Sequence, residues 1–98
     1  MLTTEQYDEI KNKQYTCKKK SLDNLLASGG IPNIKAFNKV IKDLKNRINI
    51  VENGSAFAQD LEEVTKAEVA LANLSGELMA FEETLKEIKR KIKEHSNL

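Results

Sequence analysis

The residues capable of covalent chemistry are few and widely separated in this sequence. Cys17 is the one cysteine and His95 the one histidine among 98 residues. A cysteine nucleophile needs a base held beside it, and a histidine so close to the C-terminus is expected to be poorly held. With a single cysteine, the chain has no internal disulfide. We therefore predict that Cys17 is a small, half-buried helix residue and that the chain is not an enzyme.

Carboxylates are abundant, but their spacing does not match a metal or cofactor site. Helical bundles bind metals through inward glutamates combined with Glu-x-x-His pairs, and one histidine cannot supply those pairs. Gly29-Gly30 precedes Ile31-Pro32 rather than the Gly-Lys-Ser/Thr of a phosphate-binding loop. We predict no metal and no cofactor. The acidic surface that faces solvent or a partner is expected to include Glu62, Glu63, Glu68, Glu82 and Glu83.

Basic residues form two clusters that would share one end of the molecule if the two segments that carry them lie side by side. The clusters comprise Lys18, Lys19 and Lys20 and, near the C-terminus, Lys86, Lys89, Arg90, Lys91 and Lys93. Phosphate contacts require positive charge but little geometric precision. The candidate contacts are Lys18, Lys19, Lys20, Lys89, Arg90 and Lys93. Because the net charge is only +1 and no aromatic residue interleaves with these clusters, we rank nucleic-acid association second.

The composition favours helices that are long and rarely interrupted. Hydrophobic residues make up 40% and charged residues 32%, with four glycines and one proline. An all-β sandwich would need turn residues every 8–12 positions. Apolar runs are far too short for a membrane span, and the polar, acidic N-terminus does not resemble a signal peptide. We expect a single all-α domain over residues 1–98, in the cytoplasm and without membrane contact.

The N-terminal helical segment is expected over residues 1–28. Thr3 and Gln6 have the spacing of a capping box, and Gly29-Gly30 ends the segment because glycine accepts the left-handed conformation of a helix C-cap. The middle, residues 14–17, has weak helix propensity. Ser21 could cap a separate short helix, so the sequence leaves open whether this segment is one helix or two.

The second helix is predicted over residues 33–52, after Pro32 and with Asn33 as its N-cap. Its apolar residues are spaced alternately by three and four, which is the heptad pattern of a coiled coil. They are Ile34, Phe37, Ile41, Leu44, Ile48 and Val51.

A long C-terminal helix is predicted over residues 55–96, with Asn53-Gly54 as the preceding stop and Ser55 as its N-cap. Its apolar stripe comprises Phe57, Leu61, Val64, Ala67, Leu71, Leu74, Leu78, Phe81, Leu85, Ile88 and Ile92. The stripe keeps its phase across Gly76, which falls on the outer face. One continuous helix is therefore expected, with a kink at Ser75-Gly76 as the alternative.

A turn at Asn53-Gly54 makes these two helices an antiparallel hairpin. Val51 then meets Phe57, and Phe37 meets Leu71. Charge favours this pairing, since residues 31–54 carry a net charge of +3 and residues 55–84 a net charge of −6. The second helix is shorter than the C-terminal helix, so its apolar residues can pair with only the first part of the stripe. The residues left without a partner are Leu78, Phe81, Leu85, Ile88 and Ile92.

Two coverings of this unpaired stripe are compatible with the sequence. The N-terminal segment can continue along the same groove, with Leu25 and Leu26 near Phe81. Alternatively, a second copy or another protein covers it, and dimerisation completes a four-helix bundle. We predict a non-enzymatic helical interaction protein acting as an adaptor, assembly factor or inhibitor, and a homodimer. In size and plan it is similar to small bacterial and phage helical proteins, although the Asn53-Gly54-Ser55 turn lacks the tryptophan of WXG-type hairpins.

Overall fold

The computed structural model describes residues 1–29, 33–55 and 57–96, and the side chains of these residues up to residue 94. Three helices account for most of this part of the chain: α1 (Thr4–Ala27), α2 (Ile34–Ser55) and α3 (Leu61–Ser96). The described residues contain no strand, so the all-α prediction is confirmed.

Helix α1 is one unbroken helix, which settles the question that the sequence left open. Its N-terminus has the predicted capping box, because the Gln6 backbone N–H donates to Thr3 Oγ1 at 3.1 Å and the Thr3 N–H donates to Gln6 Oε1 at 2.9 Å. At its C-terminus the Ser28 N–H donates to the Asn24 carbonyl. The next residue, Gly29, has a φ of 93°, the left-handed conformation expected of a glycine after a helix.

The start of α2 follows the sequence prediction, but the turn after it does not. The Ala36 N–H donates to Asn33 Oδ1 at 3.1 Å, so Asn33 is the N-cap. Helix α2 then continues through Asn53-Gly54 and ends at Ser55. The Ser55 hydroxyl donates to the Glu52 carbonyl of the same helix, so it does not cap the next one.

Asp60, rather than Ser55, provides the capping side chain for α3. Its Oδ1 accepts the Glu63 N–H at 2.8 Å, and Glu62 and Glu63 place negative charge in the first turn, where the helix dipole favours it. Phe57 lies before the helix and is 82% exposed. The predicted Val51–Phe57 pairing is therefore wrong, because residues before Asp60 form a longer connection in place of a tight turn.

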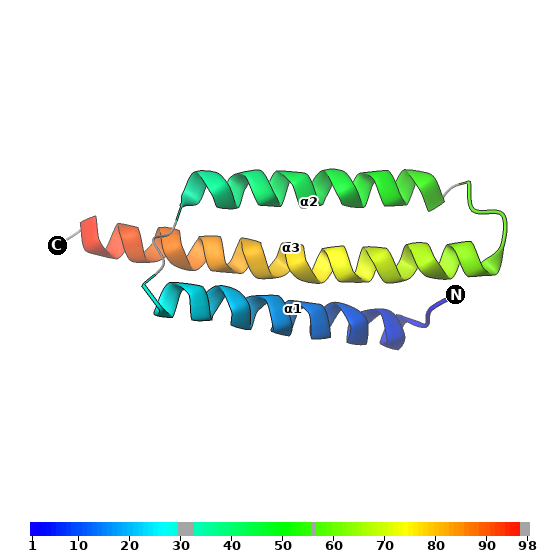
Figure 1. Cartoon of the computed structure of the whole chain (residues 1–98), viewed down its shortest axis with the longest axis horizontal. Coiled ribbons are helices and arrows are strands. Elements are labelled where there is room, and N and C mark those ends of the chain that lie inside the picture. Colours follow the sequence, from blue (N-terminus) through cyan, green and yellow to red (C-terminus); the bar gives the residue numbers. More distant parts are fainter. Residues whose placement is uncertain (30–32, 56, 97–98) are drawn as a thin grey trace.

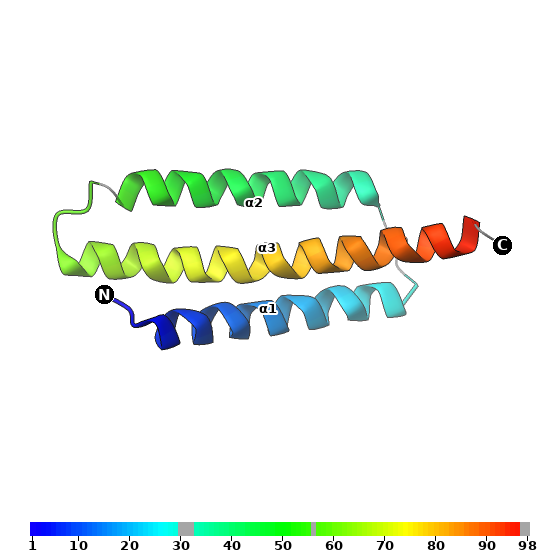
Figure 2. The same cartoon turned by 180° about the vertical axis from the view of Figure 1, so that it is seen from behind.

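Helix α3 lies between α1 and α2, and the molecule is an elongated rod 57 Å in length (Figures 1 and 2). The described parts of α1 and α2 have no Cα atoms within 8 Å of each other, so each helix packs on α3. Helix α2 runs antiparallel to α3, as predicted for the hairpin, whereas α1 runs parallel to α3 (Figure 1).

The register between α2 and α3 differs from the predicted one. The Phe37 ring packs edge-on against the Phe81 ring, with centroids 5.6 Å apart. The predicted partner was Leu71, ten residues earlier in α3. The longer connection after Ser55 permits this shift. Helix α2 consequently covers part of the stripe that the sequence left unpaired, at Phe81. The buried core includes Leu22, Ile41, Leu44, Leu85 and Ile88.

Helix α1 packs on a face of α3 made of small residues. Ala72, Ala80 and Thr84 have no exposed surface, and Gly76 is also buried. A Cβ atom at Gly76 would overlap the Lys11 carbonyl oxygen and lie 3.0 Å from Gln14 Cβ. The expectation that Gly76 lies on the outer face is therefore wrong, because the missing side chain allows the α1 backbone to approach here. The helix is continuous through this position.

The direction of α1 also differs from the covering considered from the sequence. Three pairs of residues that contact across α1 and α3 are each separated by 68 positions: Tyr7 with Ser75, Tyr15 with Glu83, and Lys19 with Glu87. A constant separation means that the two helices are parallel. Cys17 lies on the outer side of α1 and is exposed rather than half-buried, because Tyr15, Lys19 and Leu22 face α3.

Candidate functional site

Part of the surface of α3 is covered by neither of its neighbours. A groove of about 380 Å³ runs beside α3 on this surface, with α1 forming one wall. Its floor contains Leu78 and Met79, which are half-buried. We call it the α1–α3 groove, and its lining consists of Lys11, Ser75, Leu78, Met79, Glu82, Glu83 and Lys86.

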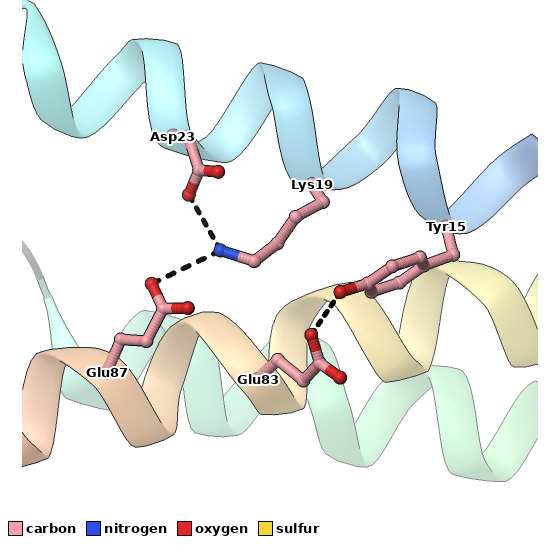
Figure 3. A network of polar contacts seen from close by, with 5 residues as sticks. All are labelled: Tyr15, Lys19, Asp23, Glu83 and Glu87. Atoms are coloured by element: carbon pink, nitrogen blue, oxygen red, sulfur yellow. Dashed lines mark hydrogen bonds and ion pairs between the residues drawn. The ribbon is translucent and has the colours of Figure 1, made fainter.

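A polar network along α1 and α3 fixes their relative position (Figure 3). The Tyr15 hydroxyl donates to the Glu83 carboxylate. Farther along, the Lys19 ammonium lies 2.7 Å from Asp23 Oδ1 and 3.2 Å from Glu87 Oε2. Tyr15, Lys19, Glu83 and Glu87 are half-buried between the helices, so the Tyr15–Glu83 and Lys19–Glu87 contacts select the parallel register as well as contributing to stability. The Lys19–Asp23 ion pair lies within α1.

The network shifts the pKa values of two of its members. The hydrogen bond to Glu83 raises the pKa of Tyr15, because the carboxylate accepts a hydrogen bond from the protonated phenol and its negative charge repels a phenolate. Burial alone would lower the pKa of Lys19, but its hydrogen bonds to Asp23 and Glu87 outweigh burial and raise it. Lys19 therefore keeps its charge and is occupied by two carboxylates.

Two further polar contacts bracket the same helix pair. Gln14 Nε2 donates to Glu77 Oε1 at 2.9 Å. At the N-terminal end, the Leu2 backbone N–H donates to Glu68 Oε2 at 2.9 Å. The α1–α3 contact thus combines a small-residue interior with polar groups along its borders.

A second concave surface lies where all three helices contribute side chains. This apolar hollow has a volume of about 260 Å³ and is lined by Leu22, Leu25, Ala36, Phe37, Val40 and Phe81. Leu25 is 57% exposed at its edge.

The residues predicted as a partner or dimer interface have different environments. Leu85 and Ile88 are buried, with 7% and 3% exposure. Leu78 lines the α1–α3 groove and Phe81 lines the apolar hollow. Ile92 is 50% exposed near the end of α3. The stripe therefore contributes to the core, the groove and the hollow in turn.

The parallel packing of α1 brings the two basic clusters to the same end of the molecule. With a separation of 68 residues, Lys18 and Lys20 lie level with residues 86 and 88. Lys19 is paired with carboxylates, and Arg90 Nε lies 3.8 Å from Glu94 Oε1. Lys20, Lys89 and Lys93 are exposed, whereas Lys18 is half-buried.

The described part of the chain has neither a metal-ligating cluster nor a membrane-spanning helix. It contains no group of three or more His, Cys, Asp or Glu residues that could hold a metal ion. The side chain of His95 lies outside the described residues. Within the described residues, no helix is long and apolar enough to cross a membrane.

Several residues of the α1–α3 groove and of the contact between α1 and α3 were not identified from the sequence. Lys11 and Met79 line the groove, and neither belongs to the apolar stripe. Thr84 is fully buried, and its hydroxyl has no hydrogen-bond partner among the described residues. The four-residue spacing of Ala72, Gly76, Ala80 and Thr84 was the available signal, since small residues at that spacing let a second helix approach closely.

Comparison with known proteins gives no assignment: no protein family, curated protein or solved structure matches this chain.

Proposed function

We propose that the chain is a non-enzymatic helical protein–protein interaction module that binds an amphipathic helix in the α1–α3 groove. The observation that carries this proposal is the partial exposure of Leu78 and Met79, which line the groove. Helix α3 has a neighbour on two sides and is open on this one. Such a surface accommodates a further helix, as in bundles completed by association.

The energetics favour a partner on this surface. Full burial of a leucine or methionine side chain stabilises by about 1.5–3 kcal/mol. Half-burial of Leu78 and Met79 therefore leaves on the order of 1 kcal/mol for each side chain to be gained on binding. Lys11, Lys86, Glu82 and Glu83 surround these two residues, so a partner that matches their charges would bind specifically.

Site-specific photo-cross-linking in the protein's native cells tests the proposal. A benzophenone amino acid in place of Met79 should form adducts with protein. The same amino acid in place of Asn46, an exposed residue of α2, serves as the matched control and should form none. Absence of protein adducts from position 79, or equal yields from both positions, would contradict the proposal.

Nucleic-acid association is a second candidate, and the shared location of the two basic clusters favours it. If Lys20 and Lys89 contact phosphates, the chain should retard DNA or RNA in a gel at low salt, and the retardation should weaken steeply as salt rises. Lys20→Glu combined with Lys89→Glu should abolish it. No retardation at low salt would remove this candidate.

A further inference from the structure

We propose that the helix bound in the α1–α3 groove is α3 of a second copy of this chain, antiparallel to the first, with the two-fold axis midway between Leu78 and Met79. This inference rests on the proposed function, since it names the partner of the same groove. It is carried by the order of side chains along the open surface of α3.

A row of residues at intervals of seven runs along this surface. Glu68, Ser75, Glu82 and Lys89 are each seven positions apart, so they share one face of the helix. Ser75 and Glu82 line the groove, so the middle of the row lies on the open side of α3. Glu68 lies at the border with the N-terminal segment, where its Oε2 accepts the Leu2 N–H, and its carboxylate can accept further hydrogen bonds. Glu68 is half-buried and Lys89 is exposed.

This row is complementary to itself when it is reversed. In an antiparallel pair, residues at equal distances from the axis face each other. With the axis between Leu78 and Met79, these two residues meet at the centre. Moving outward, Ser75 faces Glu82, Leu71 faces the aliphatic part of Lys86, and Glu68 faces Lys89. Each row position therefore meets a compatible residue.

The charge of α3 as a whole selects the same orientation. Residues 61–84 contain six acidic residues and one basic residue, whereas residues 85–94 contain five basic and two acidic residues. In this antiparallel register residues 63–72, which include Glu63 and Glu68, face the basic residues 85–94 of the other copy, whereas residues 73–84 face the same segment of the other copy. Parallel pairing would oppose like charges, and an unrelated helix of uniform charge would match only one half.

A charge exchange at the outer pair tests both the partner and the register. Glu68→Lys alone and Lys89→Glu alone should each weaken dimerisation by about tenfold, because two opposite-charge pairs become like-charge pairs. Combining both substitutions in one chain should restore the dimer. An equimolar mixture of the two single variants should also restore it, since every reversed charge again meets its opposite.

Sedimentation equilibrium is the measurement, and the parent should have twice the 11.1 kDa mass of one chain. Leu78→Asp should give a monomer. Ile50→Asp, at a position of α2 that is already 70% exposed, should remain dimeric as the matched control. Circular dichroism establishes that each variant is folded.

Three results would overturn this inference. They are a parent that stays monomeric at its highest soluble concentration, a parent that forms assemblies larger than two chains, and single variants that the exchange fails to rescue. If the parent is monomeric while position 79 cross-links to a different protein, the groove remains an interaction site and the second copy is the wrong partner.

Discussion

The two interfaces of α3 are built from different kinds of residue, although they lie on the same helix. Against α2, large apolar side chains pack together: the Phe37 ring contacts the Phe81 ring edge-on, and Leu44 is only 3% exposed. Against α1, the interior consists of Ala72, Gly76 and Ala80, and polar contacts such as Tyr15–Glu83 lie along the borders. The first interface draws its stability from buried area, whereas the second depends on close backbone approach. A substitution that removes volume should therefore affect one interface, and a substitution that adds volume should affect the other.

The largest expected effect is in the α2–α3 interface. Leu44→Ala should lower the free energy of unfolding by about 2–5 kcal/mol, because it removes a buried side chain and leaves a cavity. Urea denaturation followed by circular dichroism measures this change. Ile50→Ala, at an exposed position of the same helix, is the control and should have little effect. Equal losses from both substitutions would contradict the assigned core.

A substitution that adds volume should destabilise the α1–α3 interface. Gly76→Ala should lower the free energy of unfolding by about 1–3 kcal/mol, because the added Cβ would overlap the Lys11 carbonyl oxygen. In an unpacked helix the same change would stabilise by about 1 kcal/mol.

Gly54 provides the matched control, since a Cβ atom there meets nothing within 4 Å. Gly54→Ala should therefore be neutral or stabilising by up to about 1 kcal/mol. Both variants can be measured in the same urea titration. Stabilisation by Gly76→Ala would show that α1 does not approach α3 at this position.

These comparisons separate what the sequence could predict from what it could not. Local signals were sufficient for the capping box of Thr3 and Gln6, the N-cap at Asn33 and the continuity of α3. Each depends on residues within a few positions of each other. The start of α3 was misplaced because both Ser55 and Asp60 are good capping residues, and only packing distinguishes them.

The arrangement of the helices required information that a hydrophobic stripe does not contain. The stripe predicted that α2 pairs with α3, but the length of the connection determined whether Phe37 meets Leu71 or Phe81. Gly76 and its small neighbours contribute little hydrophobicity, so the face that binds α1 was mistaken for an outer face. The groove residues Lys11 and Met79 could not be predicted either. They lie on different helices and become neighbours only because α1 packs on the small-residue face of α3.

A smaller effect is expected from the buried hydroxyl of Thr84. Valine has nearly the same shape and lacks the polar group, which has no hydrogen-bond partner among the described residues. Thr84→Val should therefore raise the free energy of unfolding by about 1 kcal/mol. Thr84→Ser keeps the hydroxyl and loses a methyl group, so it should be destabilising. A loss of stability in the valine variant would indicate that the hydroxyl makes a favourable contact.

The smallest effect is expected at alkaline pH. The pKa of Tyr15 is raised in the folded chain above its ordinary value of 10.0, so the unfolded state loses the phenol proton first. Stability from the Tyr15–Glu83 hydrogen bond is present below pH 10.0 and is lost as pH rises through the folded pKa. Urea midpoints should therefore fall less steeply above this pH in Tyr15→Phe than in the parent. Identical slopes for the two chains would contradict this assignment.

The parallel packing of α1 on α3 determines which face of α3 is left open, and spin labels can test it directly. Labels would replace Glu5 and Glu62 in a Cys17→Ser background, and their separation would be measured by double electron–electron resonance. With the separation of 68 residues between contacting positions, Glu5 is level with residue 73, which is about 16 Å from residue 62 along the helix axis. We predict a short distance with this axial component. A distance approaching 60 Å, as expected if α1 ran antiparallel with Leu25 near Phe81, would contradict the account.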